Sequence, residues 1–81
     1  MREFHVMFRS VQEIAMFVNT VNRYPFHVWL LQGTARLDGK SLLSLCSLEL
    51  NLPATLCPDT EGDLSAFTED ILPFITESAA S

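Results

Sequence analysis

The sequence predicts an α+β fold, an open-faced β-sandwich in which a four-stranded antiparallel sheet carries three helices on one face. Apolar residues alternate with polar ones in some segments, as in half-buried strands, and recur at helical spacing in others. These segments follow one another in the order βαββαβα, whose split βαβ halves favour an antiparallel sheet. The chain has 81 residues, enough for a single domain over residues 1–81.

The first strand is expected over residues 3–8, where the apolar side chains fall on one face. Ser10 and Glu13 then match a capping box, with the serine as N-cap and the glutamate three residues later. Apolar residues at helical spacing predict a helix over residues 11–23. Pro25 ends this helix, because the residue before a proline disfavours helical backbone.

A β-hairpin is expected next. Residues 26–32 are rich in β-branched and aromatic side chains, and residues 34–38 form a shorter strand after a turn at Gly33. A second helix is expected to begin at Ser41 and to bury one face as far as Leu48.

The last strand and helix are each interrupted by a proline. A short strand is expected over residues 54–57, ended by Pro58. The acidic loop that follows suits the positive end of a helix dipole, and apolar spacing predicts a helix over residues 64–75. Pro73 lies inside that pattern, so a kink or an early end is expected near Leu72.

Composition excludes several classes of protein. The chain has 10 acidic and 5 basic side chains and a net charge of −5, and the basic residues are scattered, which argues against a nucleic-acid binder. Hydrophobic residues make up 48%, too many for a disordered acidic tail. No apolar run is long enough to cross a membrane and no signal-peptide core is present, so a cytoplasmic location is expected.

Catalytic and metal-binding patterns are missing from the sequence. Cys46 and Cys57 form no C-x-x-C motif and are expected to be buried free thiols. His5 and His27 fall on predicted strands without a nucleophile nearby, which favours ordinary histidines on the sheet surface. The sequence offers no cluster of metal ligands and no phosphate or dinucleotide loop, so we expect no metal, no cofactor and no enzymatic activity.

The segment Lys40-Ser41-Leu42, followed by Leu45 and Leu48, resembles the regulatory-serine segment of HPr, the phosphocarrier protein of the bacterial phosphoenolpyruvate-dependent sugar phosphotransferase system. The element order and the length fit as well, so the resemblance covers nearly the whole chain. It implies an HPr-like fold and makes Ser41 a candidate for regulatory phosphorylation, with Lys40 as its charge neighbour.

The chemistry of Ser41 is consistent with two roles. A serine at a helix N-terminus lies beside unpaired backbone N–H groups, which a phosphate would accept as hydrogen-bond donors. The alternative is that Ser41 serves only as an N-cap.

The resemblance fails at the carrier site. HPr proteins carry a phosphorylated histidine in a His-x-Arg-Pro segment at the start of the first helix. The family's spacing, counted back from Ser41, puts Ser10 at the histidine position, Gln12 at the arginine position and Glu13 at the proline position. A serine ester lacks the transfer potential of a phosphoimidazole, and Glu13 would repel an incoming phosphate. These three residues are therefore interpreted as the remnant of a lost carrier site.

A second departure from the family pattern follows the second helix. Glu49 stands where the family usually has a glycine, whose left-handed conformation ends the helix. The helix is expected either to end differently or to run on toward Asn51, which tolerates positive φ better.

Two surfaces are candidates for contact with other proteins. In HPr, the first two helices dock enzyme I and other partners. The matching candidates are Met16, Leu42, Leu43 and Leu45, and the partners implied are components of the phosphotransferase system or a transcriptional regulator.

The second surface is the uncovered face of the sheet. His27, Trp29 and Leu31 point there together with His5 and Met7 and suggest self-association into a homodimer, unless a loop or helix end covers Trp29.

Three functional hypotheses remain open from the sequence. The preferred one is an HPr-like regulatory or binding module without the carrier histidine. The alternatives are a phosphocarrier that uses an atypical residue, and a structural or self-associating domain with no phosphorylation.

Overall fold

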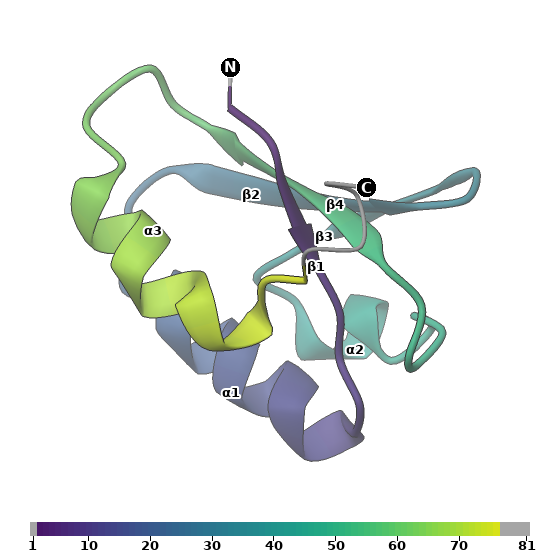
Figure 1. Cartoon of the computed structure of the whole chain (residues 1–81). Coiled ribbons are helices and arrows are strands. Elements are labelled where there is room, and N and C mark those ends of the chain that lie inside the picture. Colours follow the sequence, from purple (N-terminus) through teal and green to yellow (C-terminus); the bar gives the residue numbers. More distant parts are fainter. Residues whose placement is uncertain (1, 77–81) are drawn as a thin grey trace.

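The structure, a computed structural model, describes residues 2–76 and confirms the predicted element order (Figure 1). The elements are β1 (Phe4–Val6), α1 (Val11–Val21), β2 (His27–Gln32), β3 (Ala35–Asp38), α2 (Leu42–Leu45), β4 (Ala54–Asp59), α3 (Ser65–Ile71) and a 3-10 turn, η1 (Leu72–Phe74).

The four strands form one antiparallel sheet in the order β1-β4-β2-β3. All three helices lie on one face of this sheet, as predicted, and the other face carries no element of the described chain (Figure 1). The central strands are in register through Leu30, which pairs with Leu37 of β3 and Leu56 of β4.

The core lies between the covered face of the sheet and the helices. Alternate residues of β2 and β4, including Val28, Leu30 and Leu56, are fully buried there. The ring of Phe17 on α1 packs edge-on against two other phenylalanine rings, and Phe67 on α3 does the same with Tyr24 and Phe26. Such aromatic pairs add about 0.5–1.5 kcal/mol each to the free energy gained by burial.

The prediction that Pro58 ends the last strand is wrong, since β4 continues to Asp59 and Pro58 pairs with Val28. The Gly39 N–H donates to the Val28 carbonyl at 2.7 Å, so the polar backbone groups of Val28 face β3. The Val28–Pro58 pair is therefore a non-hydrogen-bonded one, in which β2 needs no N–H from the proline. On the other side of β4, the strand β1 (Phe4–Val6) does not extend as far as Pro58, so β1 needs no N–H from the proline either.

The second helix is shorter than predicted. α2 ends after one turn at Leu45, and turns carry the chain through Leu48. Asn51 has a φ of 64° and donates its backbone N–H to the Phe8 carbonyl at 2.7 Å. Of the two alternatives for this region, the helix ends differently, and Asn51 takes the left-handed conformation in the following turn.

The C-terminal part of the described chain confirms the effect of Pro73. α3 stops at Ile71 and gives way to η1, which contains the proline. The chain then runs along β1, where Ile75 bridges to Val6 and the Thr76 N–H donates to the His5 carbonyl at 2.8 Å. This segment covers the outer edge of the first strand.

Tyr24 and Asp70 join the end of α1 to α3. The Tyr24 hydroxyl donates to Asp70 Oδ2 at 2.5 Å, and Arg23 forms an ion pair with the same oxygen at 3.4 Å. This hydrogen bond, followed by burial and the charge of Asp70, raises the pKa of Tyr24 above its usual value of 10.0. The folded state thus holds the phenolic proton more tightly than the unfolded state, and this stabilisation is lost as the pH rises from about 10 through the raised pKa.

We predict that Asp70→Ala lowers the pKa of Tyr24 toward 10, because the acceptor that stabilises the protonated hydroxyl is gone. Tyr24 is the single tyrosine, so phenolate absorbance during a pH titration reports on it alone. Glu69→Ala, next in the chain and exposed, is the matched control and should leave the titration unchanged. An unaltered Tyr24 pKa in Asp70→Ala would contradict the assignment.

Candidate functional site

Side chains at the start of α1 accept hydrogen bonds from nearby backbone N–H groups. Ser10 has extended backbone, and its Oγ accepts a hydrogen bond from the Glu13 N–H at 3.2 Å, which confirms it as the N-cap. Glu13 Oε1 accepts from the Arg9 N–H at 2.9 Å, one residue before the position that a capping box uses. A carboxylate therefore already occupies the positive end of this helix.

This arrangement disfavours a phosphoryl group at the start of α1. The negative charge of Glu13 is held by a hydrogen bond to the backbone beside Ser10, and Gln12 is exposed and carries no charge. A helix N-terminus attracts anions through its free N–H groups and its dipole. Here Ser10 accepts from one of those N–H groups, and the carboxylate of Glu13 already interacts with the positive end of the dipole.

The start of α2 has the same serine cap without an acid in its first turn. Ser41 Oγ accepts from the Ser44 N–H at 3.3 Å, and no acidic residue lies in the first turn. The Ser41 side chain is half-buried and lies at the end of the loop after β3. With only four residues in α2, the local N–H groups matter here more than a helix dipole.

Lys40 fixes the loop before Ser41 to the end of α1. Its ammonium group donates to the Tyr24 carbonyl, its backbone N–H donates to Asp38 Oδ1 at 2.9 Å, and its carbonyl accepts from Asn22 Nδ2 at 3.3 Å. Lys40, which the sequence predicts as the charge neighbour of Ser41, is thus hydrogen-bonded to residues at the end of α1.

The two serine sites lie at opposite ends of α1. Ser10 begins the helix, whereas the loop before Ser41 is bonded to Asn22, its C-cap. An 11-residue helix is about 16 Å long, so the two hydroxyls are not parts of one site.

α1 and α2 pack side by side (Figure 1). Both helices carry exposed apolar side chains. Met16 is 59% exposed, Leu42 42% and Leu43 87%, and we refer to these three residues as the helical surface. Leu45 is fully buried, so its prediction as a partner contact is wrong. The single turn of α2 directs Leu45 into the core and Leu43 away from it.

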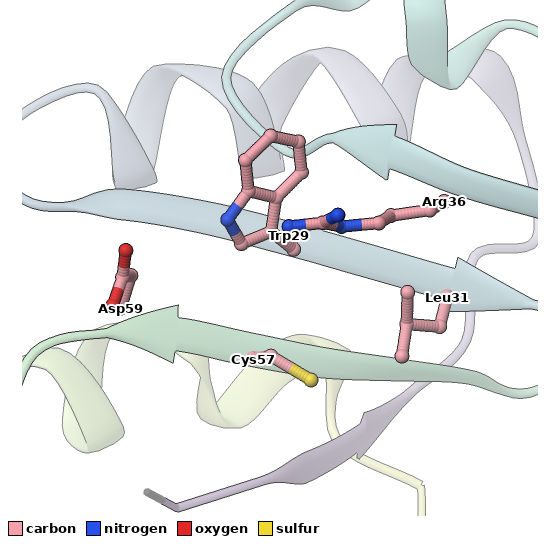
Figure 2. Close-up of a pocket in the computed structure, with 5 residues that line it drawn as sticks. All are labelled: Trp29, Leu31, Arg36, Cys57 and Asp59. Carbon is pink, nitrogen blue, oxygen red and sulfur yellow. The ribbon is translucent and has the colours of Figure 1, made fainter.

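The open face of the sheet gathers the other predicted cluster. His27 stacks on Trp29 with ring centroids 5.1 Å apart and an angle of 8° between the planes. The guanidinium of Arg36 lies over the Trp29 ring at 4.2 Å from its centroid. An open pocket of about 240 Å³ adjoins this stack and is lined by Trp29, Leu31, Arg36, Cys57 and Asp59 (Figure 2).

Sequence reasoning missed three residues of this pocket. The available signal for Arg36 was the alternation of β3, which puts it on the face opposite Leu37. Cys57 lies inside the predicted strand, where its alternation with the buried Leu56 puts it on the open face, and Asp59 would have followed from extending that strand through Pro58.

Neither cysteine is buried as predicted. Cys46 is exposed because it follows the last residue of α2, and Cys57 is half-buried because it faces the open side of the sheet. Partial burial, then the charge of Glu3, raises the pKa of the Cys57 thiol, and the charge of Arg36 opposes the rise.

Comparison with solved structures identifies the architecture. The crystal structure of HPr-C-His from Thermoanaerobacter tengcongensis matches with a TM-score of 0.73 over 100% of this chain and 98% of that chain, at 17% sequence identity. The chain has the HPr fold. No known protein family and no curated protein matches the sequence.

Two features are absent from the described residues. Over residues 2–76 no three His, Cys, Asp or Glu side chains lie close enough together to hold a metal ion. Within the same range no helix is long and apolar enough to cross a membrane.

We predict that Ser10→Ala lowers the free energy of unfolding by about 1 kcal/mol, because the Glu13 N–H loses its acceptor. Chemical denaturation measures the change. Ser10→Asn, which keeps a side-chain oxygen at the cap, should retain most of the stability. Equal stabilities for the alanine and asparagine variants would show that this cap contributes nothing.

Proposed function

We propose that this domain is a regulatory binding module related to the sugar phosphotransferase system, which contacts a protein partner in the cytoplasm through its helical surface and is switched by phosphorylation of Ser41. In this proposal it catalyses no reaction and carries no phosphoryl group to sugars. The observation that carries the proposal is the contrast between the two helix starts. Glu13 brings a carboxylate into the first turn of α1, whereas the first turn of α2 holds no acid. The carboxylate of Asp38 lies before α2, where it accepts the Lys40 N–H.

The same contrast argues against a phosphocarrier. A carrier needs a group whose phosphorylated form transfers readily, and Ser10 at the carrier position would form a stable ester. The two histidines lie elsewhere, His5 within β1 and His27 on the open face of the sheet. Neither adjoins a helix start that could hold phosphoryl oxygens.

Phosphorylation of Ser41 would act on the partner surface directly. A phosphate adds about 1.5–2 negative charges and three acceptor oxygens, which the Ser44 N–H could serve in place of the present Oγ contact. Leu42 and Leu43 follow Ser41 immediately and are exposed. A charge at this place would penalise a partner that buries these leucines and favour one that presents a basic group.

The principal alternative keeps Ser41 as an N-cap only. Its hydroxyl already accepts from Ser44, and Lys40 is engaged with Tyr24, so an unmodified Ser41 satisfies the local structure. The helical surface would then bind its partner without a switch.

We predict that intact mass spectrometry separates a phosphorylated Ser41 from a Ser41 that acts only as an N-cap, and both from a phosphocarrier. After incubation with ATP and the kinase that modifies the regulatory serine of HPr, the chain should gain about 80 Da that is stable in acid. After incubation with phosphoenolpyruvate and enzyme I, its mass should not change, because no carrier histidine stands at the start of α1.

The control variants assign the modified residue. Ser41→Ala should abolish the gain, whereas Ser47→Ala, which changes an exposed serine just beyond α2, should not. Circular dichroism verifies that both variants fold. An acid-labile gain with enzyme I would establish a carrier that uses His5 or His27, and no gain with the kinase would leave Ser41 as a cap.

We predict that Leu43→Asp weakens binding to enzyme I of the same host at least tenfold, measured by calorimetry, because it puts a charge at the most exposed apolar residue of the helical surface. Leu72→Asp is the matched control, since Leu72 is 58% exposed but lies on η1, outside the helical surface. Equal losses in the two variants, or none in Leu43→Asp, would reject this surface as the docking site.

A further inference from the structure

Charged residues surround Trp29 on the open face of the sheet. Asp38 on β3 lies directly opposite it and accepts the Lys40 N–H at 2.9 Å, and two opposite charges lie on the diagonals. Arg36 on β3 is opposite Leu31, two residues beyond Trp29 along β2. Asp59 on β4 is opposite His27, two residues before Trp29. The two charged residues therefore flank Trp29 diagonally, on the two strands that neighbour β2 (Figure 2).

Neither charge has an ion-pair or hydrogen-bond partner within the described chain. Over residues 2–76 the one ion pair joins Arg23 to Asp70, and no hydrogen bond reaches the Asp59 carboxylate. The guanidinium of Arg36 lies over the Trp29 ring, 4.2 Å from its centroid, and its N–H donors are used by no hydrogen bond of the described residues. The contact with Trp29 restrains these donors, which reduces the conformational entropy lost when they are paired.

We propose that a second copy of this chain covers this face in a two-fold symmetric dimer, with Trp29 near the axis and Arg36 of each chain paired with Asp59 of the other. A two-fold interface must be self-complementary, because each contact occurs twice with the roles exchanged. An axis in the plane of the interface that passes through Trp29, at right angles to the line from Arg36 to Asp59, exchanges those two positions. One tryptophan contact is then bordered by two identical ion pairs.

The shape of the face favours a protein surface over a small ligand. The pocket beside Trp29 is open, and its volume of about 240 Å³ lies below the usual range of about 300–1,000 Å³ for sites that enclose a small molecule. Leu31 and Trp29 give the apolar centre, and the charged residues lie around it, as in the core and rim of a protein interface.

This dimer is independent of the function proposed above. The face lies on the opposite side of the sheet from α1 and α2, so the helical surface and Ser41 stay accessible in either oligomeric state (Figure 1). Loss of the dimer would leave phosphorylation of Ser41 untouched, and the two proposals can fail separately.

Charge reversal tests the pairing directly. Sedimentation of the wild-type chain should show a monomer–dimer equilibrium, and emission from Trp29, the single tryptophan, should shift to shorter wavelength as the dimer forms. Arg36→Glu and Asp59→Arg should each weaken dimerisation roughly tenfold or more, because each homodimer then contains two like-charged pairs.

An equimolar mixture of the two variants is the decisive sample. A dimer of one Arg36→Glu chain with one Asp59→Arg chain contains two attractive pairs, Glu with Arg and Asp with Arg, so dimerisation should return. An effect confined to one chain, including loss of the contact between Arg36 and Trp29, cannot be rescued by mixing. Glu69→Arg on α3 is the charge-matched control for Asp59→Arg and should dimerise like the wild type.

The proposal is overturned by any of three results. The first is that the wild-type chain stays monomeric at all concentrations up to about 1 mM, because a dissociation constant above that value is too weak to matter. The charge reversals leave dimerisation unchanged, which would place the contact elsewhere. The mixture fails to recover a dimer although both variants are folded by circular dichroism, which would rule out pairing of Arg36 with Asp59 across the two-fold axis.

Discussion

The structure depends on a sheet that is covered on one face only. Alternation along β2 sends Val28 and Leu30 toward the helices and Trp29 toward the open side, and the pairing with β3 and β4 extends this division across the sheet. The core residues of the described chain pack between the covered face and the helices. The same division creates two outer surfaces, one on the helices and one on the open sheet.

The starts of α1 and α2 share a serine N-cap but differ in the charge of the first turn. Ser10 and Ser41 both accept a hydrogen bond from the residue three positions on. At α1 that residue is Glu13, whose carboxylate turns back to the Arg9 N–H and fills the site with negative charge. At α2 it is Ser44, which brings no charge. The caps are thus alike, and the charge of the first turn distinguishes the two starts.

Local patterns predicted the features that local interactions create. Both serine caps, the turn at Gly33 and the early end of the last helix follow from a few neighbouring residues. The extension of β4 through Pro58 could not be derived in this way. It depends on whether the neighbouring strands need a backbone N–H from position 58, which a proline does not have. Likewise, the grouping of Arg36 with Asp59 around Trp29 results from the register between three strands, which no single segment encodes.

The position of the two surfaces has a consequence for binding. A dimer formed through the open sheet faces would direct both helical surfaces outward, each with its own Ser41, on opposite sides of the assembly. Two linked sites can engage a partner that is itself dimeric, and the second contact then forms at a raised effective concentration without any new interaction. Phosphorylation of Ser41 in both chains would act on both contacts, so that a modest effect on each would be multiplied in the complex.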